Sequence, residues 1–218
     1  MLTYLQFLEP AIGPLRLFQF ISVRSVLAGL LALLFGFILG PKLISALQRI
    51  GAKQAFREKS EVGELADLHE SKAKTPTMGG LLIFGSVLFS TILCADLNVY
   101  VITALAVYGI LTLIGFCDDY LKISQKNSKG LAGRYKLLGQ FIATSVALFI
   151  LIGPLSEMLT GIHGRAVGSS EKMFELWIPF YKDVLITSMP VVCVFSLFLI
   201  TLTGSSNAIT LTDGLDGL

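Results

Sequence analysis

The chain has 218 residues, of which 54% are hydrophobic and 15% are charged, and its mean hydropathy is +0.76. An average soluble domain carries about 25% charged residues, so this composition excludes both an ordinary soluble protein and a disordered one. The net charge of +2 offers no basic surface for nucleic acid, and we expect a membrane protein with no nucleic-acid partner.

Five long apolar stretches predict the fold class, which is an all-α, polytopic bundle of transmembrane helices. A helix needs about 20 apolar residues to cross the hydrocarbon layer, and continuous apolar runs favour helices over the strands of a membrane barrel. Residues 1–218 are therefore predicted to form one integral membrane domain. Its spans are expected at residues 25–47, 76–95, 98–117, 137–157 and 184–203.

The segments between the spans predict the orientation of the chain. Residues 48–74 hold six and residues 118–136 hold five of the 17 Lys and Arg residues, whereas the turn from Asp96 to Asn98 holds none. Because basic loops stay in the cytoplasm, both basic segments are predicted to be cytoplasmic and the N-terminus periplasmic. Aromatic residues between 174 and 181 favour the membrane interface, and we expect a short amphipathic or hairpin element there.

The first polar motif runs from Lys72 to Gly80 and opens the second predicted span. Thr75 suits a helix N-cap and Pro76 the first helical position, and the free N–H groups of a helix N-terminus beside lysines suit a phosphate. Lys72 and Thr75 are therefore candidate substrate-binding residues. The plainer alternative is a span that starts between interfacial lysines, and this motif taken alone favours that alternative.

The second motif is the pair Asp118 and Asp119, directly after the third predicted span. Adjacent carboxylates repel each other, and a divalent cation relieves that repulsion. Mg²⁺ commonly binds one or two carboxylates together with substrate phosphate, so the pair is a candidate catalytic and metal site. A solvated pair that simply ends a helix explains the motif equally well.

The third motif, residues 130–140, places Arg134 and Lys136 before the fourth predicted span. These side chains would either hold phosphates through charge-assisted hydrogen bonds or anchor the span among lipid headgroups. The segment alone slightly favours anchors.

The fourth motif, residues 205–218, is dense in aspartate and glycine. A helix would place Asp213 and Asp216 on one face, whereas the Asp–Gly pairs would instead mark turns. Asn207 and several hydroxyl groups add donors suited to a sugar or a base edge. This density is unusual for a simple loop and favours a binding site.

Together the four motifs resemble, in order and spacing from Lys72 to Leu218, the bacterial phospho-N-acetylmuramoyl-pentapeptide transferases. That family belongs to the polyprenyl-phosphate N-acetylhexosamine-1-phosphate transferases. The resemblance implies transfer of phospho-MurNAc-pentapeptide from UDP-MurNAc-pentapeptide to undecaprenyl phosphate, which gives lipid I and UMP. This is the first membrane step of peptidoglycan synthesis, on which cell shape and division depend.

The resemblance also implies the setting of the reaction. It implies Mg²⁺ as the cofactor and an active site on the cytoplasmic face of the bacterial inner membrane, where a soluble nucleotide sugar meets a lipid phosphate. Similar enzymes are dimeric, although no residue of this sequence establishes an interface.

Roles follow from the resemblance residue by residue. Asp118 would orient or deprotonate the lipid phosphate, and Asp119 would lie near Mg²⁺ or support the site. The implied substrate-binding residues are Lys72, Thr75, Lys136, Asn207, Thr210, Asp213 and Asp216. The implied metal ligands are Asp118, Asp119 and Asp213.

The sequence departs from the family pattern at two positions and in length. Lys74 stands where relatives usually have Gly, and Thr210 stands where they usually have Asn, whose amide both donates and accepts. Family members also continue beyond Leu218, with about ten helices in all and further acidic and histidine-rich motifs. We therefore expect an N-terminal half, which by itself would lack full metal coordination, so an inactive fragment stays open as an alternative.

Three alternatives compete with this interpretation. A sibling transferase would load GlcNAc-1-phosphate for teichoic acid or O-antigen, but the motifs at residues 75–80 and 130–140 resemble the muramoyl branch. A transporter would need charged residues inside its spans, and none lies well inside the last four predicted spans. An inactive fragment is the third alternative.

Overall fold

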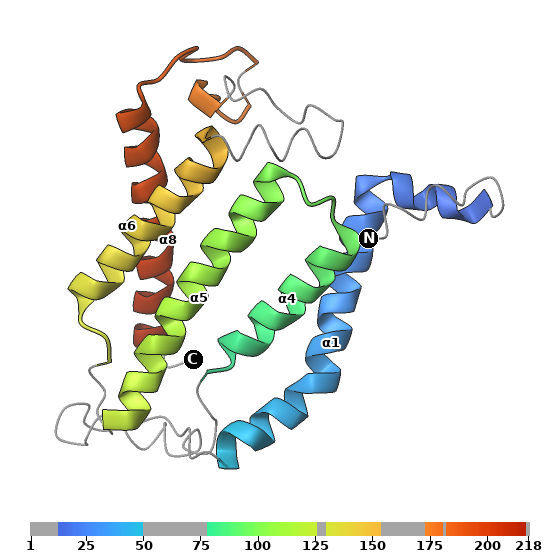
Figure 1. The fold of residues 1–218 in the computed structure, drawn as a ribbon, viewed down its shortest axis with the longest axis vertical. Coiled ribbons are helices and arrows are strands. Elements are labelled where there is room, and N and C mark those ends of the chain that lie inside the picture. Colours follow the sequence, from blue (N-terminus) through green and yellow to red (C-terminus); the bar gives the residue numbers. More distant parts are fainter. Residues whose placement is uncertain (1–12, 50–77, 126–129, 154–172, 181, 217–218) are drawn as a thin grey trace. The chain divides into compact units, whose positions relative to one another are not determined.

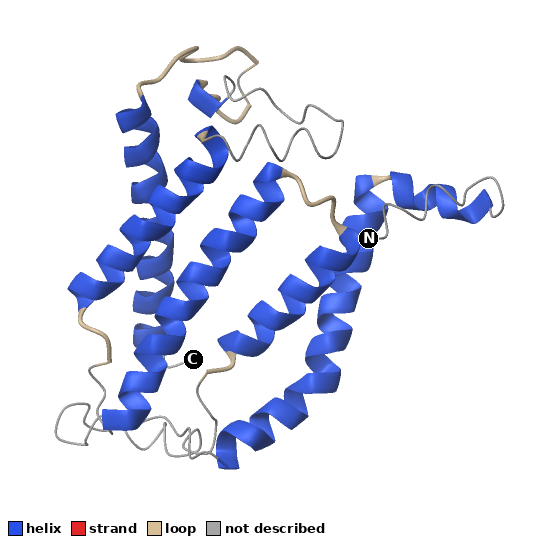
Figure 2. Ribbon diagram, in the orientation of Figure 1, coloured by secondary structure: helices blue, strands red, loops and turns tan. Residues whose placement is uncertain are grey.

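The computed structural model describes residues 13–49, 78–125, 130–153, 173–180 and 182–216. The described chain is helical: η2 (Gly13–Gln19), α1 (Ile21–Arg49), α4 (Gly80–Cys94), α5 (Val99–Gln125), α6 (Gly133–Ile152) and α8 (Val191–Asp216) follow one another (Figure 1). Apart from one isolated bridge between Leu176 and Ile186, this part of the chain pairs no strands (Figure 2). The predicted all-α fold class is confirmed.

Four helices are long and apolar enough to cross a membrane. They are α1, α5, α6 and residues Val191–Ile209 of α8. The predicted span at residues 76–95 corresponds to α4, a shorter apolar helix of 15 residues. At 1.5 Å per residue α4 is about 22 Å long, less than the roughly 30 Å of a hydrocarbon core. Residues 76 and 77, where this span was expected to begin, lie outside the described part of the chain.

The chain divides into two compact units. Unit 1 comprises residues 1–97 and 112–132, and unit 2 comprises residues 98–111 and 133–218. Helix α5 therefore contributes its first half to unit 2 and its second half to unit 1.

Helices α1 and α4 pack against each other in opposite directions and form the body of unit 1 (Figure 1). Near the start of α1, Arg24 Nη1 lies 2.8 Å from Asp96 Oδ2, just beyond the end of α4. Further along, the rings of Phe35 and Phe89 stack with their centroids 5.0 Å apart. The start of α1 and the turn after α4 therefore lie at the same end of unit 1, as the predicted orientation requires.

Small residues allow the backbones of α1 and α4 to approach closely. A Cβ atom added to Gly36 would lie 3.8 Å from Ser86 Oγ, and one added to Gly40 would lie 3.5 Å from Leu82 Cδ2. Ser86 and Ser90 are both buried, and their hydroxyls donate to carbonyls of α4 itself. The Gly-x-x-x-Gly spacing is typical of helix pairs in membranes, where close packing replaces the hydrophobic effect.

The core of unit 2 is built mainly on α6, whose Ala143 and Thr144 are fully buried. Phe141 of α6 meets Phe195 of α8 edge to face at 5.2 Å. Asn98 begins α5 because its side-chain Oδ1 accepts the N–H of Val101 at 3.0 Å, which caps the helix.

Unit 2 also holds an apolar cavity of about 660 Å³ between α5, α6 and α8. Its lining residues are Tyr100, Thr103, Ala104, Val107, Tyr108, Leu111, Ala147, Leu151, Leu197, Phe198, Thr201 and Leu202. No Asp, Glu, Lys, Arg or His is among these described residues, so the cavity offers no charged group to a phosphate.

Helix α8 begins at Val191, later than the span expected from Val184, because the preceding residues form a hairpin. The N–H of Leu176 donates to the carbonyl of Ile186 at 2.8 Å, and the N–H of Leu185 donates back to Leu176 at 2.9 Å. This pairing confirms the hairpin alternative for the aromatic segment. The carbonyl of Pro190, just before α8, accepts hydrogen bonds from the N–H groups of Cys193 and Val194.

Candidate active site

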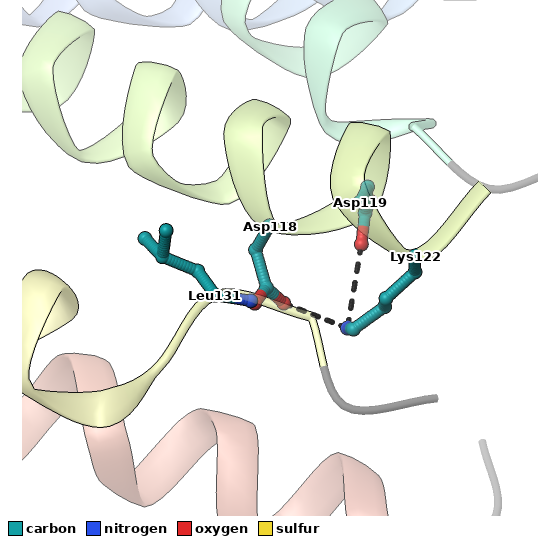
Figure 3. A network of polar contacts seen from close by, with 4 residues as sticks. All are labelled: Asp118, Asp119, Lys122 and Leu131. Atoms are coloured by element: carbon teal, nitrogen blue, oxygen red, sulfur yellow. Dashed lines mark hydrogen bonds and ion pairs between the residues drawn. The ribbon is translucent and has the colours of Figure 1, made fainter. Parts of the chain in front are cut away.

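Asp118 and Asp119 lie within the last turns of α5, which continues to Gln125 (Figure 3). Asp118 is buried, with 7% of its surface exposed, whereas Asp119 is half-buried. A buried carboxylate is costly unless it is paired and hydrogen-bonded, so its partners define the site.

Lys122 is the cation that both carboxylates share. Its Nζ lies 2.7 Å from Asp118 Oδ2 and 3.6 Å from Asp119 Oδ1, as drawn in Figure 3. The spacing explains the geometry, because residues three and four positions apart are neighbours on a helix surface. The ammonium offsets the repulsion between the two carboxylates, so the helix can continue beyond them.

The segment that precedes α6 returns to Asp118 and supplies a second partner. The N–H of Leu131 donates to Asp118 Oδ1 at 2.7 Å, so each oxygen of this carboxylate has a short contact (Figure 3). Gly130 has φ +59°, and a Cβ atom at this position would lie 2.5 Å from Asp118 Oδ1. Only glycine fits here, because both the backbone conformation and the space exclude a side chain.

The structure describes four of the predicted site side chains. Asp118 and Asp119 lie together in unit 1, and Lys136 on α6 and Asn207 on α8 are half-buried residues of unit 2. Lys72, Lys74 and Thr75 lie outside the described residues.

The fourth motif is helical as far as Asp216, so the helical alternative is confirmed for its backbone and the turn alternative is wrong. The side chains of Thr210, Asp213 and Asp216 lie outside the part of the structure that is described.

The two aspartates fit the chemistry of Mg²⁺. Among the described residues no group of three or more His, Cys, Asp and Glu side chains gathers, so this part of the chain offers two carboxylates and no larger cage. Mg²⁺ keeps several waters and takes one or two carboxylates plus substrate phosphate. Asp118 and Asp119, which both contact the Lys122 ammonium, are the residues that would hold it.

The sequence interpretation did not identify Lys122, Gly130 or Leu131 as partners of Asp118. The signal for Lys122 was its i+4 spacing from Asp118 on a helix. The signal for Gly130 was a glycine ahead of an expected span, which often marks a close backbone approach. The Leu131 contact has no sequence signal, because a backbone N–H is present in every residue except proline.

Two sequence patterns match the chain. The pattern of glycosyl transferase family 4 matches residues 99–218. The pattern "Phospho-N-acetylmuramoyl-pentapeptide-transferase signature 1" matches residues 72–84. The first match covers α5, α6 and α8, and therefore includes Asp118, Asp119, Lys122 and Gly130.

Curated relatives agree with both patterns. A phospho-N-acetylmuramoyl-pentapeptide-transferase of Opitutus terrae is 39% identical over 218 residues, which are 100% of this chain and 55% of the relative. One of Maridesulfovibrio salexigens is 40% identical over 212 residues, which are 97% of this chain and 53% of the relative. The chain thus spans about half the length of the curated relatives it matches, and the family resemblance read from its motifs is confirmed.

Proposed function

Because the chain belongs to glycosyl transferase family 4, we propose that it transfers phospho-MurNAc-pentapeptide from UDP-MurNAc-pentapeptide to undecaprenyl phosphate. The products are lipid I and UMP, and the step is the first membrane reaction of peptidoglycan synthesis. The observation that carries the proposal is the buried Asp118, held between Lys122 and the Leu131 N–H in a chain that also matches the transferase signature.

The reaction is a phosphoryl transfer, in which catalysis rests on positioning and on neutralising charge. An oxygen of the lipid phosphate forms a bond to the sugar-linked phosphorus of the donor, and the bond from that phosphorus to the UMP oxygen breaks. Asp118 orients the lipid phosphate or accepts its proton, and its fixed carboxylate keeps that oxygen in place. When bound, Mg²⁺ supplies positive charge to the diphosphate and to UMP.

The remaining substrate contacts follow from the family motifs. Lys72 and Lys136 would hold phosphates, Thr75 would contribute the helix N-terminus, and Asn207, Thr210, Asp213 and Asp216 would engage the nucleotide sugar. Asp213 would also order or complete the metal site. These assignments rest on the matched segments and not on contacts between the units.

We place the reaction at the cytoplasmic face of the bacterial inner membrane. Four candidate spans support a multi-pass membrane protein, and the Arg24–Asp96 pair supports a shared face for the start of α1 and the turn after α4. The basic segments and Asp118 would then lie at the opposite, cytoplasmic face. At that face a soluble nucleotide sugar can reach a lipid phosphate. The homodimer stays a prediction from the resemblance.

The test is UMP release by membranes that contain the chain, supplied with UDP-MurNAc-pentapeptide, undecaprenyl phosphate and Mg²⁺. We expect Asp118→Asn to reduce release by about 10²- to 10⁴-fold, because loss of a general acid–base group has this effect. Tyr120→Phe is the matched control on the same helix, since Tyr120 is exposed and its ring is retained. Expression of each variant is measured alongside.

Three outcomes would count against the proposal. Release no higher than in membranes without the chain would reject the activity. Equal turnover by Asp118→Asn would remove this residue from catalysis. Release with UDP-GlcNAc and not with the muramoyl donor would favour the sibling transferase.

A further inference from the structure

Asp118 has two oxygens that face two different kinds of partner. Oδ1 accepts a hydrogen bond from the backbone N–H of Leu131 at 2.7 Å, and Oδ2 contacts the Lys122 ammonium at 2.7 Å. The first partner is fixed by the chain itself. The second sits at the end of a flexible side chain that is 36% exposed.

We propose that Gly130 and Leu131 form a backbone clasp that positions Asp118, anchoring Oδ1 and leaving Oδ2 as the oxygen that meets substrate. This inference rests on the proposed function for the role of Oδ2, while the clasp itself is a matter of structure. Gly130 and Leu131 are positioning residues, because they act through Asp118.

Gly130 is the part of the clasp that a side chain would destroy. A Cβ atom there would lie 2.5 Å from Asp118 Oδ1, 3.1 Å from Asp118 Cγ and 2.8 Å from Lys122 Cε. Gly130 also has a positive φ of 59°, and the N–H of the next residue, Leu131, donates to the carboxylate (Figure 3). The glycine therefore allows the backbone to approach Asp118 closely, and this approach brings the Leu131 N–H within hydrogen-bond distance.

The difference between the two oxygens follows from the cost of moving each partner. Releasing Oδ1 would require the 130–131 backbone to move away and would leave a buried acceptor without its donor, which is unfavourable. Separating Oδ2 from Lys122 requires that a long, flexible lysine side chain change rotamer, and the backbone need not move. A phosphate or a divalent cation can therefore reach Oδ2 while Oδ1 keeps the carboxylate in one orientation, which is the preorganisation that fast chemistry needs.

The clasp can be tested without any activity. The pair Gly–Leu occurs five times in the sequence, so carbonyl-¹³C glycine with ¹⁵N leucine selects five amide signals in the detergent-solubilised chain. We expect Asp118→Ala to shift the Leu131 amide proton upfield by more than any of the other four, because its charged acceptor is gone. Asp119→Ala is the matched control, since Leu131 does not donate to Asp119. An unmoved Leu131 signal in Asp118→Ala overturns the clasp.

The consequence for catalysis is tested with Gly130→Ala in the UMP-release assay. We expect kcat to fall by about 10²-fold, because a displaced catalytic group costs this much, while KM for the UDP-linked donor changes by less than about twofold. Gly133→Ala is the control three residues on, since a Cβ atom there meets nothing within 4 Å. Gly130→Asn, which tolerates positive φ but still carries a Cβ atom, should show the same loss.

The outcomes separate the two proposals. An inactive wild-type chain rejects the proposed function, and the leucine spectrum still decides whether the clasp exists. An active wild-type chain with unchanged kcat in Gly130→Ala and Gly130→Asn overturns the positioning role.

Discussion

Asp118 lies just after the end of the predicted membrane span but before the end of helix α5. The sequence predicted that the membrane span ends at residue 117, because carboxylates are costly in hydrocarbon. The helix itself continues to Gln125, because Lys122 lies close to both acids and its charge compensates theirs. A change in hydropathy therefore located the two carboxylates, while the end of the helix depended on side-chain pairing.

Replacement of Lys122 tests whether a cation at this place stabilises the two carboxylates. We expect Lys122→Met to lower the free energy of unfolding by up to about 1 kcal/mol in EDTA, because the pair is only partly buried. Mg²⁺ at ten times its Kd should raise the free energy of unfolding of this variant by about 1.4 kcal/mol, since a ligand that binds only the folded state stabilises it. Thermal unfolding in detergent, with and without Mg²⁺, measures both effects.

Lys42→Met is the control for that measurement, because Lys42 is an exposed lysine of α1. Mg²⁺ should stabilise Lys122→Met more than either this control or the wild type. Equal stabilisation of all three proteins would show that the ion does not replace the lysine.

At the level of helices, composition predicted where most elements occur but not how they pair. Long uncharged runs located α1, α5 and α6. They placed the start of α8 too early, because residues 184–189 are as apolar as a span but carry hairpin hydrogen bonds. Hydropathy measures compatibility with lipid, and it does not distinguish a helix from a short hairpin.

The pairing of α1 with α4 rests on a small-residue face, which gives a prediction for this element. We expect Gly40→Leu to destabilise unit 1 by about 1–3 kcal/mol, because Leu82 already occupies the space that a larger side chain needs. Thermal unfolding in detergent measures the loss. Gly29→Leu on the same helix should be nearly neutral, since a Cβ atom there meets nothing within 4 Å. Equal losses in both variants would contradict this packing.

For the whole molecule, the motifs predicted the family but only part of the site. The Asp118–Asp119 pair was recognisable because adjacent acids after an apolar run are rare. Its partners were not identified, since the Leu131 N–H that reaches Asp118 lies 13 residues away in the sequence, and no local pattern encodes such a contact. Contacts that are distant in sequence depend on tertiary geometry, whereas the Lys122 contact has a signal in its helix spacing that the sequence interpretation did not use.

The proposed function requires that the acidic motifs of α5 and α8 face the same side of the membrane. Single cysteines at Ser124, Thr212 and Leu97, introduced after replacement of the three native cysteines by alanine, test it with a membrane-impermeant maleimide. In intact spheroplasts we expect Leu97→Cys to react, and Ser124→Cys and Thr212→Cys to react only after permeabilisation. Reaction of Ser124→Cys and Thr212→Cys from opposite faces would contradict the account.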